Sequence, residues 1–315
     1  MPTPARPLRI LVAFLLGLAA FLVAGPITPV ATAATQVCSS STTPEQRPLL
    51  RKGDTGSCVK VLQDLLLLQG YSLKKNGSFD AATDTAVRRF QHDRVGLVID
   101  GVVTPETWSA LVSGGTLYSI QRGPNLSDKV VLSFDDCPKD ADAFQAAVLD
   151  AESLGIALVL MPTGDCLGSG RFDAALARTH GHYVFNHSVT HPHLTELSAK
   201  KVLAELGAPG VVTNYGRPPY GAYNTPTVRD AYAQRAMRIW TWDVDTRDWE
   251  GKSTDEVVAF VLENTTARDT VLMHMQWNGF NRSALSSIQA GLRALGLEVC
   301  HNQGQPTDVR PVLTC

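Results

Sequence analysis

The sequence predicts an α/β protein, built as a distorted parallel (β/α) barrel that is preceded by a small all-helical bundle. Short apolar runs typical of buried strands alternate with helical segments beyond Val130, which indicates a parallel sheet. Earlier in the chain, apolar residues such as Val59 and Leu62 repeat at helical spacing instead. Between these two patterns, residues 114–128 are predicted to form a linker because they contain Gly114, Gly115, Gly123 and Pro124.

Three helices are expected in the smaller unit, which we place at residues 44–113. The first covers residues 59–66 and can end at Gly70, and the second covers residues 83–95. The third begins after Thr104, a capping residue that is followed by proline at the first helical position. Turn signals lie between these helices, at Asn76-Gly77 and Asp100-Gly101.

The larger unit is predicted at residues 129–301, with a C-terminal tail at 302–315. Its expected strands are 130–134, 156–161, 183–185, 211–214, 239–242, 271–273 and 297–299. Helices are expected between most of them, for example at 142–154, 172–180 and 253–263. In folds of this kind, active residues gather at the C-terminal ends of the strands.

Residues 1–33 are predicted to be a signal peptide, so the mature chain is expected to be secreted. Arg6 and Arg9 precede an apolar run at 10–25, and small residues for cleavage follow at Ala31-Thr32-Ala33. The alternative is a membrane anchor, but the run is shorter than the ~20 residues of a typical spanning helix. The formal charge of −2 does not favour a nucleic-acid or anionic-membrane partner.

The chain has six cysteines, an even number that suits an oxidising compartment. Six cysteines allow fifteen pairings, and pairing sequence neighbours is the simplest choice. Cys137 and Cys166 follow two consecutive predicted strands, whose C-terminal ends open on the same rim, so we expect a disulfide between them. The alternative is that Cys137 stays a thiol and binds a metal ion, as a fourth ligand beside one carboxylate and two histidines of the chain.

Polar motifs follow five of the predicted strands. In chain order they are Ser133-Phe134-Asp135-Asp136, Asn186-His187-Ser188-Val189-Thr190-His191, Arg217-Pro218-Pro219-Tyr220-Gly221, Trp242-Asp243-Val244-Asp245-Thr246-Arg247-Asp248-Trp249 and Leu272-Met273-His274. Each has an ordinary explanation on its own, such as a turn, a cap or a core tryptophan. Together, however, the motifs offer two histidines four residues apart, which can lie on one face of a helical turn, and one carboxylate. A metal ion held by these three ligands would keep coordination positions open for water and substrate, which is typical of catalytic sites.

These motifs, in this order, resemble the polysaccharide deacetylase family, carbohydrate esterase family 4, from about residue 130 to 300. The resemblance implies that Asp135 is the general base, that Arg217 orients it, and that His274 is the general acid. Metal ligation is implied for Asp136, His187 and His191. Asp248 would pair with His274, with Asp245 as a weaker candidate, while the Tyr220 backbone N–H, Trp249 and Leu272 would contact substrate.

The resemblance also implies a hydrolase in which a zinc-activated water attacks the acetamide carbonyl of a polysaccharide; another divalent transition metal is the alternative. The smaller unit resembles the peptidoglycan-binding-domain-1 family in Arg51-Lys52-Gly53-Asp54, Asn76-Gly77-Ser78-Phe79 and Ala86-Val87-Arg88-Arg89-Phe90-Gln91. The expected substrate is therefore peptidoglycan, and the alternatives are chitin oligomers, acetylxylan, or a non-catalytic wall-binding protein. We expect a monomer that is secreted or wall-associated and that, after signal cleavage, has no membrane or nucleic-acid partner.

Two positions depart from the family pattern. Cys137 stands where the family usually has glycine after the paired aspartates, and Gly181-His182-Tyr183 stands where it usually has Gly-His-Glu. Neither departure removes an implied ligand, acid or base.

Overall fold

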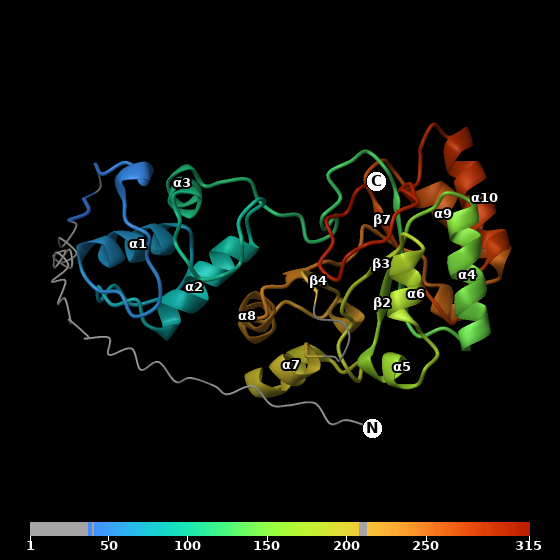
Figure 1. Ribbon diagram of the computed structural model, residues 1–315, viewed down its shortest axis with the longest axis horizontal. Helices are drawn as coiled ribbons and strands as arrows, with labels where there is room; N and C mark the ends of the chain where they lie inside the picture. Colours follow the sequence, from blue (N-terminus) through green and yellow to red (C-terminus); the bar gives the residue numbers. More distant parts are fainter. Residues whose placement is uncertain (1–36, 40, 208–212) are drawn as a thin grey trace, which may run out of the picture. The chain divides into compact units, whose positions relative to one another are not determined.

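The computed structural model describes residues 37–39, 41–207 and 213–315, and Figure 1 shows their helices and strands. The predicted signal peptide at residues 1–33 lies outside the described residues. Within the described part, no helix is long and apolar enough to span a membrane.

The smaller unit is helical, as predicted. It contains the short 3₁₀ helix η1 (Pro44–Gln46) and the helices α1 (Ser57–Leu68), α2 (Ala81–His92) and α3 (Pro105–Ser113). Helix α2 begins two residues before the predicted start because the Asp80 side chain accepts a hydrogen bond from the Thr83 backbone and caps it. The apolar sides of the helices meet in a core around Leu62, Phe90 and Trp108, all fully buried.

The larger unit is built on parallel strands, which confirms the predicted α/β class. A five-stranded sheet has the order β3-β2-β1-β7-β6, and a second sheet pairs β4 with β5. The strands are β1 (Val131–Asp136), β2 (Leu158–Pro162), β3 (Tyr183–Val184), β4 (Tyr215–Gly216), β5 (Arg238–Ile239), β6 (Val244–Asp245) and β7 (Thr270–His274). A bridge between Asn186 and Gly216 continues the order from β3 to β4, so the strands follow one another as in an incomplete barrel.

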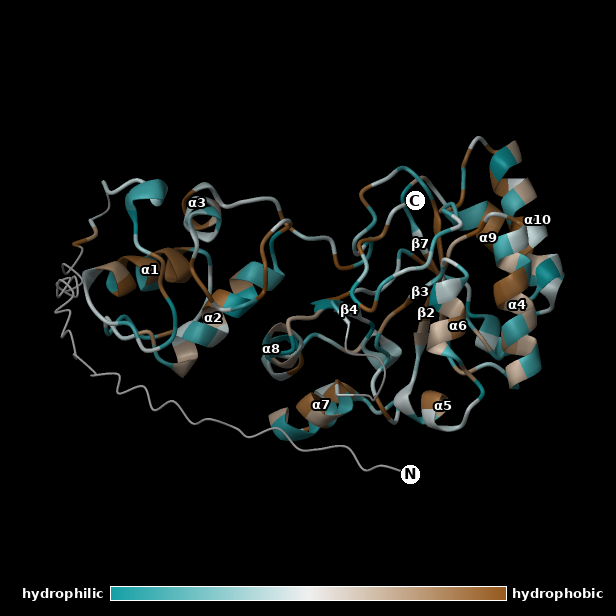
Figure 2. Cartoon of the chain, in the orientation of Figure 1, coloured by the Kyte–Doolittle hydropathy of each residue, from teal (hydrophilic) through white to brown (hydrophobic). Residues whose placement is uncertain are grey.

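Helices connect the strands, and most of them pack on the five-stranded sheet, while two pack in a separate core that contains Ile239 of β5. They are α4 (Ala141–Ser153), α5 (Gly164–Gly168), α6 (Ala174–Thr179), α7 (Ala199–Glu205), α8 (Pro226–Gln234), α9 (Thr254–Asn264) and α10 (Arg282–Ala294). Helices α4 and α10 carry both apolar and polar residues (Figure 2). Their apolar residues, including Phe144, Val148 and Ile288, are buried in the same core as Phe134 of β1.

Three predicted strands differ from the structure. Residues 211–212 lie outside the described part, and the nearby strand is β4 at Tyr215–Gly216 instead of 211–214. Strand β5 ends at Ile239, before the predicted residues 240–242. Residues 297–299 contribute an isolated bridge from Val299 to Val130 and no longer strand. All three strands are short, so a few hydrogen bonds decide their bounds.

Three disulfides join sequence neighbours, as predicted: Cys38–Cys58, Cys137–Cys166 and Cys300–Cys315. The last of these holds the C-terminal tail against the larger unit. Leu313 is buried there, and the Tyr183 hydroxyl donates a hydrogen bond to the Thr314 carbonyl.

Candidate active site

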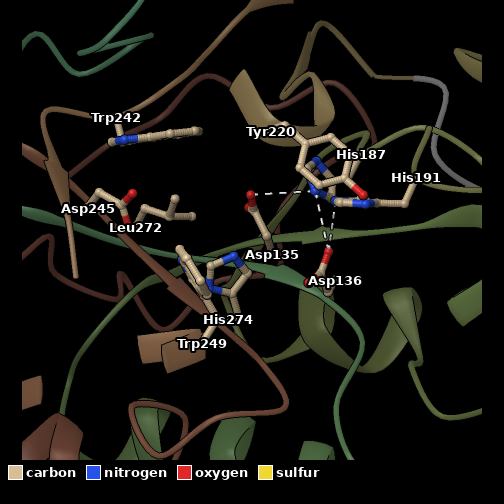
Figure 3. A pocket seen from close by; sticks show the side chains of 10 residues that line it. All are labelled: Asp135, Asp136, His187, His191, Tyr220, Trp242, Asp245, Trp249, Leu272 and His274. Carbon is tan, nitrogen blue, oxygen red and sulfur yellow. Dashed lines mark ion pairs between the residues drawn. The ribbon is translucent and has the colours of Figure 1, made fainter. Parts of the chain in front are cut away.

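One cavity of about 410 Å³ at the C-terminal ends of β1, β6 and β7 is lined by most of the predicted residues, but not by the fully buried Arg217 and Asp248 (Figure 3). Its lining consists of Asp135, Asp136, His187, His191, Tyr220, Trp242, Asp245, Trp249, Leu272 and His274. In Figure 3, Trp242 and Asp245 lie on one side of the cavity and His187 and His191 on the other, with Asp135 between them.

Asp135 is held by a fully buried arginine. Its Oδ1 accepts a hydrogen bond from Nη1 of Arg217 at 2.6 Å. The other arginine nitrogens bond to the protein as well, Nη2 to the Ser133 hydroxyl and the Thr241 carbonyl and Nε to the Trp240 carbonyl. Because each nitrogen has a partner, the guanidinium is fixed and leaves Asp135 one defined orientation.

Asp136, His187 and His191 form a group that can hold a metal ion, since a ligand atom from each lies within 4.8 Å of the others. Oδ1 of Asp136 is 3.5 Å from Nε2 of His187 and 3.3 Å from Nε2 of His191. Nδ1 of His187 donates to the Arg217 carbonyl at 2.9 Å, which leaves Nε2 as the free ligand atom. Two imidazoles and one carboxylate match the donors of a catalytic transition-metal site.

The sequence predicted that the two histidines lie on a helical turn. In the structure they lie in an irregular loop instead. Ser188 and His191 have positive φ angles of 64° and 59°. The loop is fixed by hydrogen bonds, from the His191 backbone to the Ser188 hydroxyl and from the Val189 and Thr190 backbones to Glu205. A helical turn was therefore not needed to bring the two rings together.

The charges in this group are coupled. Burial opposes ionisation of Asp136, but hydrogen bonding to His187 outweighs it, and the pKa of Asp136 is lowered well below its ordinary value. Burial likewise opposes protonation of His187, yet the charges of Asp135 and Asp136 raise its pKa. The site therefore stabilises positive charge beside two carboxylates, as a cation site requires.

His274 at the end of β7 pairs with Asp248, which is fully buried. Its Nδ1 lies 2.7 Å from Oδ1 of Asp248, and its backbone N–H donates to Oδ2 at 2.8 Å. Burial disfavours the charged ring, but the Asp248 hydrogen bond outweighs burial and raises the pKa of His274. Asp245, the weaker candidate for this pairing, lines the cavity and accepts a hydrogen bond from the Arg247 backbone.

The rim of the cavity is aromatic. Tyr220 is 59% exposed and has a positive φ of 59°, which turns its ring to stack on His193 with centroids 3.8 Å apart. Trp249 is also half-exposed at the cavity. The sequence suggested His193 as a weaker candidate for substrate contact, whereas Trp242 and Gln276, which bonds to Asp136, were not among the predicted site residues. Trp242 and Gln276 could have been suspected, since Trp242 opens the fourth motif and Gln276 follows His274 closely.

The unusual Cys137 is joined to Cys166 and is therefore not a metal ligand. It directly follows Asp136, which has a positive φ of 72°. The disulfide ties this turn, at the end of β1, to helix α5 beyond the end of β2.

Comparisons with known proteins match both units of the chain. Residues 55–111 match the model of a putative peptidoglycan binding domain, and residues 122–240 match that of polysaccharide deacetylase. A bifunctional xylanase/xylan deacetylase of Cellvibrio japonicus is 31% identical over 60% of this chain and 29% of its own length. A peptidoglycan-N-acetylglucosamine deacetylase of Bacillus cereus is 27% identical over 53% of this chain and 62% of its own length.

Among solved structures, a mutant of a CE4 family pseudoenzyme with restored enzymatic activity resembles the larger unit with a TM-score of 0.50. It is 21% identical and covers 62% of this chain and 71% of its own chain, a likeness that concerns the fold alone. This chain thus spans less than two thirds of either curated relative. By these matches, residues 122–240 belong to a polysaccharide deacetylase domain, and residues 55–111 belong to a domain of the putative peptidoglycan-binding type.

Proposed function

We propose that the protein is a secreted, metal-dependent hydrolase that removes N-acetyl groups from cell-wall polysaccharide, with peptidoglycan as its substrate. The observation that carries this proposal is the shared cavity, which is lined by a candidate base, a candidate acid and a candidate metal group. These are Asp135, His274 and the cluster of Asp136, His187 and His191.

Asp136, His187 and His191 would hold zinc, and another divalent transition metal is the alternative. When bound, zinc lowers the pKa of water and polarises a carbonyl oxygen. Three protein ligands leave further positions for solvent and substrate. The hydrogen bond from Nδ1 of His187 to the Arg217 carbonyl supports this assignment, because it directs Nε2 toward Asp136.

Asp135 acts as the base, taking a proton from water while the water oxygen forms a bond to the acetamide carbon. The Tyr220 backbone N–H donates to the oxyanion that develops on the carbonyl oxygen. The carbon–nitrogen bond then breaks as His274 delivers its proton to the departing nitrogen. The products are acetate and the free amine of the sugar. Trp249 and Leu272 shape the pocket, and Asp248 keeps His274 protonated.

The peptidoglycan-binding domain favours peptidoglycan over chitin oligomers and acetylxylan, although the relative that acts on xylan keeps acetylxylan as an alternative. A non-catalytic wall-binding protein is less well supported, since each implied ligand, acid and base is present in the cavity. Three disulfides support an extracellular or wall location.

Acetate release from peptidoglycan, chitin oligomers and acetylxylan should be measured side by side, with zinc and with a chelator. We expect peptidoglycan to give the highest rate and the chelator to abolish it. A higher rate on acetylxylan would make acetylxylan the proposed substrate in place of peptidoglycan. If the zinc-loaded protein released no acetate from any of the three, a non-catalytic wall-binding role would be favoured.

A further inference from the structure

A groove of about 760 Å³ lies on the helical unit, apart from the deacetylase cavity. Arg47, just after η1, lines it together with aliphatic residues of α1 and α3. Among these, Leu68 is 81% exposed, and Leu67 and Val112 are also exposed to solvent. Aliphatic side chains left in solvent around one depression are typical of a binding surface.

Arg47 is an unusual residue to find in such a groove. It is only 6% exposed, and its guanidinium carbon lies 4.9 Å from the centre of the Trp108 ring. Its Nε and Nη1 are buried and have no hydrogen-bond partner, and no acidic residue of the described part forms an ion pair with it. A buried cation without a partner is costly, so an anion brought to the groove gains from its charge.

The acidic residue of the groove does not neutralise Arg47. Asp64 lines the same groove, but its carboxylate pairs with Lys75 at 2.5 Å. The groove therefore offers one cation without an acidic partner beside an aliphatic wall. A guanidinium matches a carboxylate in its planar geometry, and the wall suits small aliphatic side chains.

We propose that this groove binds the free terminal carboxylate of a short peptide with small aliphatic side chains, the chemistry of a peptidoglycan stem peptide. The proposal rests on the proposed function, because it names the part of the wall that the helical unit holds. Arg47 precedes the matched residues 55–111, so it is a feature of this chain beyond the family match. A phosphate-bearing wall polymer would also offer an anion, but it would leave the aliphatic wall without a contact.

The intact chain should be titrated by calorimetry with diacetyl-L-Lys-D-Ala-D-Ala and with the same peptide carrying a C-terminal amide. We expect the amide to bind about tenfold more weakly or worse, since it lacks the charge that Arg47 attracts. Arg47→Met, which keeps an apolar side chain over Trp108, should weaken binding of the acid similarly. Arg51→Met is the matched control, because Arg51 is exposed and does not line the groove.

Leu68→Glu tests the site without touching a buried residue, because it places a negative charge at an exposed position of the groove. It should weaken binding of the acid more than binding of the amide. Equal affinity for the two peptides, unchanged affinity in Arg47→Met and Leu68→Glu, or tighter binding of inorganic phosphate would overturn the proposal. Acetate release from soluble oligomers, measured in the same variants, reports on the deacetylase function separately and should not change.

Discussion

Gln276 donates a hydrogen bond from Nε2 to Oδ2 of Asp136 at 2.9 Å. The other carboxylate oxygen, Oδ1, faces His187 and His191. One oxygen of Asp136 is therefore held by an amide, while the second points to the place where a metal would lie. Hydrogen bonds of this kind orient metal ligands and commonly contribute a factor of about 10–100 in metal affinity.

Replacing Gln276 by alanine should therefore weaken zinc binding by about 10–100-fold, measured by competition with a chromogenic chelator. Gln289→Ala is the control, since Gln289 bonds to the Leu154 carbonyl, away from the site. The metal-free variants should melt close to wild type. Equal zinc affinity in wild type and Gln276→Ala would show that Asp136 is oriented without the amide.

Asp135→Asn should lower acetate release by about 10²–10⁴-fold while zinc stays bound, because the residue is proposed as the base and not as a ligand. The asparagine oxygen can still accept the Arg217 hydrogen bond. His191→Ala, by contrast, should lose both zinc and activity. Turnover and metal content of the two purified variants separate the roles, and near-normal turnover of Asp135→Asn would exclude it as the base.

The pH dependence of kcat/KM should follow His274. Its pKa is raised, so the proton that it donates is kept at neutral pH and lost as the pH rises through the raised value. Asp248→Asn removes the carboxylate that supports this charge, and the alkaline limb should move to lower pH. If the limb stays in place, another group controls it.

Folding stability should fall with acid because of His182. Its Nδ1 accepts from the Leu158 backbone and its Nε2 donates to the Val148 carbonyl, and burial lowers its pKa to about 4. The unfolded chain, with an ordinary pKa of about 6.5, binds the proton first. His182 therefore contributes fully to the free energy of unfolding above pH 6.5. This contribution, about 3 kcal/mol, is lost as the pH falls toward 4.

Urea unfolding of metal-free wild type and His182→Gln between pH 7 and pH 4.5 measures this contribution. Both proteins share the other titrating groups, so the difference between their slopes isolates His182. Parallel pH profiles would contradict the assignment.

Loss of the Cys137–Cys166 bond should affect both stability and metal affinity. Replacing both cysteines by serine opens a crosslink between residues 29 apart and should lower the free energy of unfolding by about 2–4 kcal/mol. Because Cys137 adjoins Asp136, zinc affinity should fall as well. The same replacement at Cys300 and Cys315 should reduce stability and leave zinc affinity unchanged; an equal loss of affinity in both would point to a global effect.

Long elements of the fold could be predicted from the sequence, and short ones could not. Strands β1, β2 and β7 have five or six residues and are rich in buried apolar side chains, so their positions were predicted closely. Strands β4 and β5 have two residues each, and residues outside the strands, such as Asn214 and Trp240, take part in the backbone hydrogen bonds beside them. A two-residue strand has no periodicity, so its bounds depend on tertiary contacts.

The candidate site shows the same division. Its motif residues were found because strand ends carry unusual chemistry, and most of them line one cavity. Arg217 and Asp248 do not line it and instead contact Asp135 and His274. The prediction missed residues whose importance depends on contacts in the folded structure. Gln276 looks ordinary in sequence, and its place beside Asp136 depends on the turn after β7. Arg47 is one arginine among several and becomes notable only when its burial against Trp108 is known.

The fully bonded Arg217 has a consequence for which residues of this site can be changed. Each nitrogen of Arg217 is hydrogen-bonded to protein atoms, so this arginine orients Asp135 and is not available to bind a sugar. The surfaces open to a sugar belong to other side chains, chiefly the exposed rings of Tyr220 and Trp249. In the proposed mechanism, the residues that would contact a sugar are therefore separate from the residue that orients the base. A substitution at the rim can change substrate contacts and leave the hydrogen bond between Arg217 and Asp135 intact.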